Sequence, residues 1–294
     1  MTEGKLRILI IGAHPADVFD NAGGTLAHHV ARGDQVTALA LTQGTRVHDV
    51  IISEELRKGG QVPAPEKLDA LIQERMKVKH QETLNACAIM GFTDVRFLTY
   101  TDSVLTLKEE IIEAIACLIR EVRPHIVITS YPFENGGIAD QHAVTAQLAI
   151  YAINAAASVG RGDPHLPHRV AQVFFMATPS GLNRATILAA EPIGYPDVYI
   201  DISDVIERKI AALDCLKSQQ YDGAYARKRV EATDGCFGMF VGVPYAEAFM
   251  RYRPELHDYL PLGPYALDRA NEVESQLHAR MDVLVAHKVP IKYQ

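Results

Sequence analysis

The chain has no run rich in Lys or Arg, and its 36 acidic residues outnumber its 29 basic ones, which gives a formal net charge of −7 at pH 7. Proteins that bind nucleic acid or anionic membranes carry clustered basic side chains. The sequence also lacks a cationic leader followed by an apolar core, and no stretch approaches the roughly eighteen apolar residues of a membrane-spanning helix. These absences argue against nucleic acid and membranes as partners, and we expect a cytoplasmic protein.

A CxxC spacing is absent as well, because Cys87, Cys117, Cys215 and Cys236 lie far apart. Buried thiols are therefore the expected state of all four. Apolar residues make up 48% of the chain and charged residues 22%, which carries no signature of disorder. A chain of 294 residues with this composition can bury a sizeable core.

Short apolar runs alternate with helical patterns along the chain, which predicts an α/β fold. The expected fold has a Rossmann-like, mostly parallel sheet with helices on both faces, followed by a C-terminal extension. We expect one domain over 1–294, with a core part at 1–160 and strands and helices at 161–294 that complete the site. The pattern predicts strands at 7–12, 35–42, 95–98, 126–130, 172–176 and 198–201, and helices at 21–32, 65–90, 111–122, from 144, at 203–219 and at 264–287.

The densest polar cluster follows the first predicted strand and reads Ala13-His14-Pro15-Ala16-Asp17. A dinucleotide-binding turn needs glycines at this place, so NAD is disfavoured. A His and an Asp three residues apart on a tight turn can both reach one ion, and this donor pair suits Zn²⁺. The alternative is that His14 packs in the core and Asp17 only caps the following helix.

A catalytic zinc site takes three protein ligands, so a third must come from another strand end. His142 follows the fourth predicted strand and its loop, and this topology places it on the same edge of the sheet as His14. A solvent-exposed His at the start of a helix is the alternative.

The opening turn resembles the AHPDDE signature of the PIG-L/LmbE superfamily of zinc enzymes, which are similar to N-acetylglucosaminyl deacetylases. The resemblance implies an LmbE-like fold, a bound Zn²⁺, and His14, Asp17 and His142 as its ligands. It also implies that the general base of deacetylation belongs at position 16. This chain has Ala16 there, which puts deacetylation in doubt.

The 4-oxalomesaconate hydratase branch of the superfamily looks closer. Its turn also has Ala before the Asp, an Ala-Gly-Gly helix start like 22–24, and a Tyr-Ala-Glu segment like 245–247. Two departures stand out. Thr45 replaces an acidic candidate base of that branch, and Gln141 replaces the Asp expected beside the third ligand, with Asp140 one place earlier.

Substitutes for the missing base can be named. His48 and Asp49 lie on a loop expected above the metal, although a solvated loop pair would look the same. Asp140 could orient His142, or could serve only in a turn. Four residues are candidates for substrate contact, each with an ordinary surface or ion-pair role as its alternative: Arg46, Lys79, Tyr225 and Arg229.

Three functions follow. The first is a zinc-dependent hydratase, a lyase that adds water to a small unsaturated carboxylic acid, with Arg46 and Lys79 binding the anion. The alternative is a zinc-dependent deacetylase, a hydrolase of an N-acyl sugar or a related small molecule. The third is a metal-binding member without catalysis, which the loss of acids at positions 16 and 45 would produce. The family likeness is also compatible with a homo-oligomer.

Overall fold

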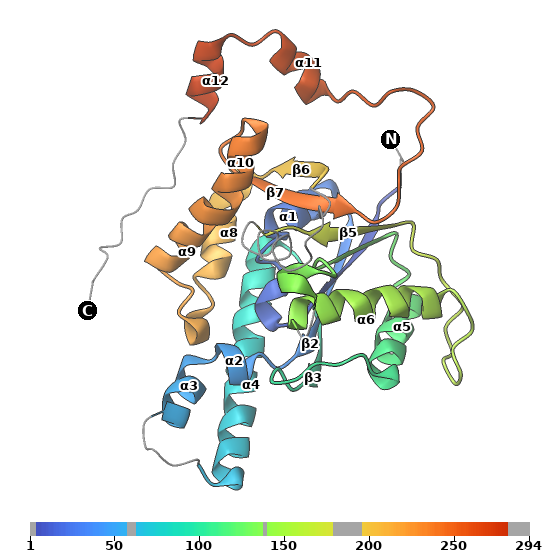
Figure 1. The fold of residues 1–294 in the computed structure, drawn as a ribbon, viewed down its shortest axis with the longest axis vertical. Coiled ribbons are helices and arrows are strands. Elements are labelled where there is room, and N and C mark those ends of the chain that lie inside the picture. The colour runs from blue at the N-terminus through green and yellow to red at the C-terminus, as the bar shows by residue number, and fades with distance from the viewer. Residues whose placement is uncertain (1–3, 58–62, 138–139, 179–195, 282–294) are drawn as a thin grey trace.

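The computed structural model describes residues 4–57, 63–137, 140–178 and 196–281. A seven-stranded sheet with the order β3-β2-β1-β4-β5-β7-β6 forms its centre (Figure 1). The strands are β1 (Arg7–Gly12), β2 (Gln35–Thr42), β3 (Asp94–Tyr100), β4 (Ile126–Thr129), β5 (Gln172–Met176), β6 (Val198–Asp201) and β7 (Ala246–Arg251). The first five strands pair in parallel, as the sequence predicts, while β7 pairs antiparallel with β5 and β6.

Helices cover both faces of this sheet. Alternate side chains of β1 point to opposite faces, because successive residues of a strand do so. Ile8 and Ile10 belong to a core with α1, α4, α8 and α9, and Leu9 and Ile11 belong to a second core with α5, α6 and α10. These helices are α1 (Gly23–Arg32), α4 (Pro65–Met90), α5 (Glu109–Val122), α6 (Gln141–Ala156), α8 (Ile206–Leu213), α9 (Ala224–Val230) and α10 (Cys236–Val241).

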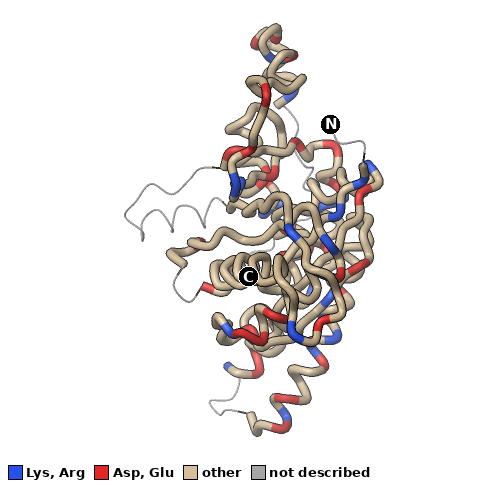
Figure 2. Tube along the Cα trace, turned by 90° about the vertical axis from the view of Figure 1, so that its right-hand side faces the viewer, with Lys and Arg blue, Asp and Glu red and all other residues tan. Residues whose placement is uncertain are grey.

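Shorter elements complete the described chain. They are α2 (Thr45–His48), α3 (Val50–Arg57), α11 (Pro264–Ala270), α12 (Glu274–Met281), the 3-10 helices η1 (Pro15–Val18), η2 (Glu134–Gly136), η3 (Ser203–Val205) and η4 (Lys217–Gln219), and the π-helical turn η5 (Glu231–Gly235). None of the described helices is long and apolar enough to cross a membrane. Lys and Arg are interspersed with Asp and Glu along the chain (Figure 2), in keeping with the absence of a basic run.

The C-terminal part differs most from the sequence prediction. Strand β7 was not expected, and the helix predicted at 203–219 ends at Leu213, since Leu216 leaves the helical conformation. The helix predicted at 264–287 is two short helices, and its last residues lie outside the described ones. Of the four cysteines expected to be buried, only Cys87 is, and the other three are partly exposed.

A buried ionic cluster joins this C-terminal part to the start of α1. The carboxylate of Glu247 on β7 accepts the backbone N–H groups of Gly24 and Thr25, at 2.9 and 2.8 Å, and so occupies donors that a helix start leaves free. The Nζ of Lys209 lies 2.8 Å from carboxylate oxygens of both Glu247 and Asp234. Although burial disfavours its charge, these carboxylates raise the pKa of Lys209. The ammonium therefore holds two buried carboxylates together.

Replacing Lys209 by Met should lower the free energy of unfolding by about 3–5 kcal/mol, since two buried carboxylates lose their counter-ion. Chemical denaturation followed by circular dichroism measures this. The matched control is Lys67→Met, which removes the exposed ion pair of Lys67 with Glu55, 3.7 Å apart, and should cost less than about 1 kcal/mol. Equal effects of the two substitutions would contradict the role of the buried cluster.

Candidate metal centre

The turn after β1 brings His14 and Asp17 together. His14 caps η1, and its backbone N–H donates to Asp17 Oδ2 at 2.8 Å. A side chain at Gly12 would place its Cβ 2.7 Å from Asp17 Cβ, so only glycine permits this close return of the chain. Thr42 at the end of β2 donates through its backbone N–H and its hydroxyl to the Ala13 carbonyl, which fixes the turn to the sheet.

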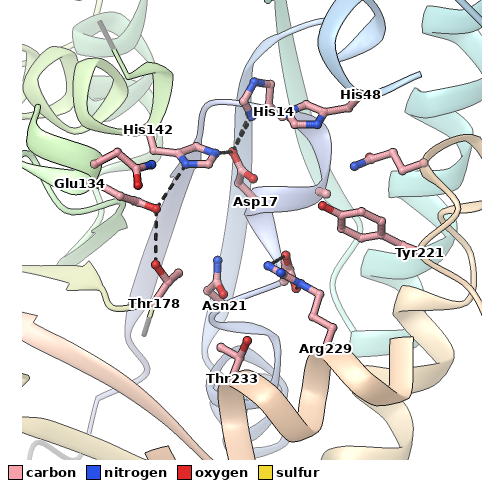
Figure 3. A pocket seen from close by; sticks show the side chains of 14 residues that line it. His14, Asp17, Asn21, His48, Glu134, His142, Thr178, Tyr221, Arg229 and Thr233 are labelled. Carbon is pink, nitrogen blue, oxygen red and sulfur yellow. Dashed lines mark hydrogen bonds and ion pairs between the residues drawn. The ribbon is translucent and has the colours of Figure 1, made fainter. Parts of the chain in front are cut away.

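His142 reaches the same point from the start of α6, as the sequence predicts (Figure 3). Asp17 Oδ2 lies 3.3 Å from His14 Nδ1 and 3.4 Å from His142 Nε2. One ligand atom from each of the three residues lies within 4.8 Å of the others. The carboxyl ends of β1 and β4 therefore gather two imidazoles and one carboxylate, a donor set that zinc enzymes use.

The free nitrogen of His14 is fixed by a partner that the sequence analysis noted only as a departure. His14 Nε2 lies 2.8 Å from Gln141 Oε1, and the Nε2 of Gln141 donates to the backbone carbonyl of Asp102. The Gln141 oxygen thus faces His14, so His14 Nε2 carries the proton and Nδ1 presents a lone pair. That Nδ1 atom is buried and has no hydrogen-bond partner in the part of the chain that the structure describes.

The other imidazole is oriented in a similar way by Glu134 on η2. His142 Nδ1 lies 3.4 Å from Glu134 Oε1, which leaves Nε2 facing Asp17. Asp140, expected to orient His142, lies farther from that Nδ1, at 3.9 Å. Its carboxylate instead accepts the backbone N–H groups of His142 and Ala143, and so serves as the N-cap of α6. The structure therefore gives Glu134 the position that the sequence analysis assigned to Asp140.

The arrangement of charges around Asp17 fits a cation. A lone pair of His14 aimed at a carboxylate 3.3 Å away is repulsive unless a positive charge lies between them. Burial disfavours the charge of Asp17, yet His142 and His14 hold its pKa well below the usual value. Burial also acts against a charged His142, but Asp17 and Glu134 raise its pKa well above 6.5. A divalent metal would satisfy all three groups at once.

A cavity of about 290 Å³ opens beside these three residues. Ala16 lies on its wall, and so does His48 of α2, whose ring packs edge-on against His14 with the centroids 4.4 Å apart. Burial, followed by the nearby His14, lowers the pKa of His48 to about 4, so this ring is neutral near pH 7. Asp49, the neighbour considered with it, is buried and paired with Arg75 at 3.0 Å, away from the cavity wall.

Of the four residues predicted to contact substrate, Arg229 alone lines this cavity. Lys79 lies on α4 and is buried, with Nζ 3.2 Å from the Ser218 hydroxyl and 3.5 Å from the His48 carbonyl. Burial lowers the pKa of Lys79 to about 8. Arg46 is exposed, and its guanidinium is 3.5 Å from Ser103. Tyr225, also exposed, packs against Tyr221 with the two rings tilted by 36°.

The cavity also contains residues that the sequence analysis missed or set aside. Asp20 forms two hydrogen bonds with the guanidinium of Arg229, which in turn lies 5.6 Å from the ring centre of Tyr221. The remaining polar side chains on the wall are Asn21, Glu134, Asn135, Thr178, Gln219 and Thr233. Asp20 and Asn21 belong to the polar cluster after β1 and could have been found there. The others come from distant segments, and no spacing in the sequence indicates that they meet.

Known proteins resemble this chain over most of its length. The family model of GlcNAc-PI de-N-acetylases, PIG-L, matches residues 9–153. The 1D-myo-inositol 2-acetamido-2-deoxy-alpha-D-glucopyranoside deacetylase of Geodermatophilus obscurus is 32% identical over 245 residues, which cover 76% of this chain and 79% of that protein. The chain belongs to the PIG-L family. The 4-oxalmesaconate hydratase of Pseudomonas putida is also similar, at 23% identity over 72% of this chain and 74% of that protein.

Membership of the PIG-L family confirms the resemblance noted from the turn after β1. A solved structure of the 4-carboxy-2-hydroxymuconate hydratase GalB from Pseudomonas putida shares the fold with a TM-score of 0.67, at 21% identity, covering 87% of this chain and all of that one. The α/β prediction is thereby confirmed. PIG-L relatives of both kinds support an enzyme that is a hydrolase or a lyase. The higher identity to a deacetylase favours the alternative named from the sequence over the hydratase placed first.

Purified protein should contain about one equivalent of divalent metal per chain, and both His14→Ala and His142→Ala should lose it, because each removes one of three ligands. Elemental analysis after dialysis measures the content. His165→Ala is the control, since His165 lies with Cys117 and Asp163 in a second cluster where Arg120 already binds Asp163 at 2.6 Å. Full metal content in both ligand variants would refute the assignment.

Gln141→Leu should weaken metal binding about 10- to 100-fold while all three ligands remain, because the proton of His14 is then free to move to Nδ1. Competition with a chromophoric chelator measures the affinity. The conservative variant Gln141→Asn and the nearby Gln147→Leu serve as comparisons, since Gln147 bonds the Pro132 carbonyl and not a ligand. Unchanged affinity in Gln141→Leu would show that the amide does not set the tautomer.

Proposed function

We propose that the protein is a zinc-dependent N-deacylase that removes a small acyl group from a neutral, polyhydroxylated amine derivative such as an N-acetyl sugar conjugate. The observation that carries this proposal is the convergence of His14, Asp17 and His142 beside a cavity walled by hydrogen-bonding side chains. Two imidazoles and one carboxylate suit Zn²⁺ better than the oxygen-preferring ions. The similarity to a deacetylase of an acetamido sugar supports the same class of substrate.

The charges of the cavity argue against a polyanionic substrate. Among the described residues of its wall, the carboxylates are Asp17, Asp20 and Glu134, and the one permanently cationic side chain is Arg229. That guanidinium is already engaged by Asp20, with Nε to Oδ1 at 2.8 Å. Even with a divalent metal bound, the wall carries no positive surplus for a di- or tricarboxylate. Neutral hydroxyl and amide groups match Asn21, Thr233 and their neighbours better.

The general base can be assigned by elimination. Ala16 offers only a methyl group at the position where the family resemblance implies an acid. Asp20 is held by Arg229, and Glu134 is held between His142 and the hydroxyl of Thr178, 3.5 Å away. His48 remains as an imidazole on the cavity wall beside a ligand. We assign proton transfer to a ring nitrogen of His48.

The residues then divide the reaction as follows. His14, Asp17 and His142 would hold the zinc, which when bound would supply Lewis acidity toward water and toward the acyl carbonyl. His48 takes the proton of the attacking water and returns it to the amine nitrogen as the C–N bond breaks, so atoms and charges balance. Gln141 and Glu134 keep both ligand imidazoles in the required tautomers. Asn21 and Thr233 lie across the cavity from the three ligands (Figure 3), where they would bind hydroxyl groups of the substrate.

His48→Ala should lower kcat/KM at least about 100-fold while the metal content stays unchanged, because general base catalysis contributes about that much and His48 is no ligand. The double variant His48→Ala with Ala16→Asp should regain part of this loss, since it restores a carboxylate at the position that the family resemblance implies. Rates of acetate release measure both. A His48→Ala variant with normal kcat would refute the assignment, and a rescue shows that the lost function is proton transfer.

A panel of substrates separates the proposal from its rival. Ala16 is the observation that favours a hydratase, because adding water to a double bond does not need an acid at that position. N-acetyl sugars and their conjugates should release acetate, and unsaturated di- and tricarboxylates should remain unchanged by ultraviolet absorbance. Loss of the conjugated double bond without acetate release would establish the hydratase instead. Inactivity toward every compound, with metal bound, would favour a member without catalysis.

A further inference from the structure

The segment that follows β7 is exposed along almost its whole length. This C-terminal arm, residues 252–281, leaves β7 as an extended chain and ends in α11 and α12, which lie apart from the sheet (Figure 1). Every residue of the arm is exposed except Arg269, Glu272, Arg280 and Met281, which are partly buried. The arm therefore contributes nothing to the core of its own chain.

The two helices of the arm cannot depend on their own stability. α11 has seven residues and α12 has eight, and neither buries a single side chain. Isolated helices shorter than about 12 residues are marginal in water, and packing of an apolar face normally stabilises them. A folded arm therefore needs a surface that covers it.

Large apolar side chains are concentrated on this arm. Leu256 and Leu260 are 97% and 96% exposed, and Tyr259 is 87% exposed. Other large apolar side chains of the arm that are more than half exposed are Leu262, Tyr265, Leu267 and Val273. A standard protein interface buries about 800 Å² on each partner, which takes a group of large exposed side chains such as this one. Monomeric proteins rarely expose large apolar patches, and seven large apolar side chains of this one segment are more than half exposed.

Polar contacts anchor the arm to its own chain at both ends. Near its beginning, Arg251 of β7 pairs with Asp197 at 2.7 Å. Near its middle, the Tyr265 hydroxyl donates to Asp201 at 3.0 Å, and near its end Arg280 Nε donates to the Gly242 carbonyl at 2.8 Å. The stretch that carries Leu256 and Leu260 lies between these anchors.

A receiving surface exists on the same molecule. The end of α10 and the facing side of α12 form an open groove of about 670 Å³, lined in part by Met239, Leu277 and Met281. Met239 and its neighbour Phe240 are both 71% exposed. Methionines adapt to the shape of an inserted leucine. One chain thus carries both the apolar side chains and a groove of matching character.

We propose that the arm binds a second copy of this chain, with Leu256 and Leu260 of each protomer covered in the partner's groove between α10 and α12. A two-fold arrangement makes the exchange reciprocal, so that both arms and both grooves are covered. Residues 252–267 contain Arg253, Glu255 and Asp258 and no Lys, so they carry no positive surplus for an anionic membrane or nucleic acid. A second copy of the chain would cover the apolar side chains of the arm, and this contact needs no positive charge on the arm.

The mass in solution tests this proposal. Light scattering after size exclusion should give at least twice 32.4 kDa for the unaltered protein. The double variant Leu256→Asp with Leu260→Asp should shift to 32.4 kDa at concentrations where the unaltered protein stays assembled, a rise of about 100-fold or more in the dissociation constant. Both leucines are almost fully exposed in the single chain, so the fold of one protomer is not disturbed. Met239→Asp should act in the same way through the groove.

Val159→Asp is the matched control, because Val159 is 79% exposed in the loop after α6, outside the arm and the groove. This variant should keep the mass of the unaltered protein. A monomeric unaltered protein would overturn the proposal, as would assembly that survives the arm variant or is equally lost in the control. Flotation with vesicles of phosphatidylcholine and phosphatidylserine that depends on Leu256 and Leu260 would assign the arm to membranes instead. None of these measurements depends on catalysis, so their outcomes are independent of the proposed function.

Discussion

The contact of Glu247 with the start of α1 is the constraint on which the position of the site depends. α1 follows directly on the metal turn, and its first free N–H groups are taken by a carboxylate from the penultimate strand in the sheet order. Lys209 neutralises that carboxylate in the core. A helix start needs such an acceptor, and a buried acceptor of negative charge needs a cation, so three distant segments are bound into one unit. The Tyr-Ala-Glu segment noted in the sequence thereby has a structural reason.

The candidate metal centre shows how neighbouring groups select one state of each imidazole. His14 and His142 each have a second nitrogen, and hydrogen bonding at that nitrogen decides which atom faces Asp17. Gln141 performs this role for His14 with a neutral amide, and Glu134 performs it for His142 with a carboxylate. The replacement of an expected Asp by Gln141 therefore keeps the geometry while lowering the negative charge near the ligands.

Under the proposed function, the absence of an acid at position 16 separates metal binding from proton transfer, two tasks that one turn would otherwise combine. The turn would keep two of the three metal ligands, and His48 on a different element would transfer the proton. Among the described residues of the cavity wall, the pairing of Asp20 with Arg229 leaves no free permanently cationic side chain. This pairing weighs toward neutral substrates, and it could be recognised only once residues 209 positions apart were seen in contact.

The sequence alone determined the parallel half of the sheet and its helices, because these depend on local patterns, and the resemblance of the turn after β1 to the PIG-L/LmbE signature supplied the three candidate ligands. Strands β1 and β2 and helix α4 have the predicted bounds, since buried runs, glycine ends and Pro65 mark them locally. Strand β7 escaped prediction because its place between two strands comes from long-range pairing. Tertiary structure alone decided that Glu134 and not Asp140 lies nearer His142 Nδ1, and that Arg46 and Lys79 stay off the cavity wall. A spacing in sequence limits which side chains can meet, whereas packing of distant elements fixes which of them do.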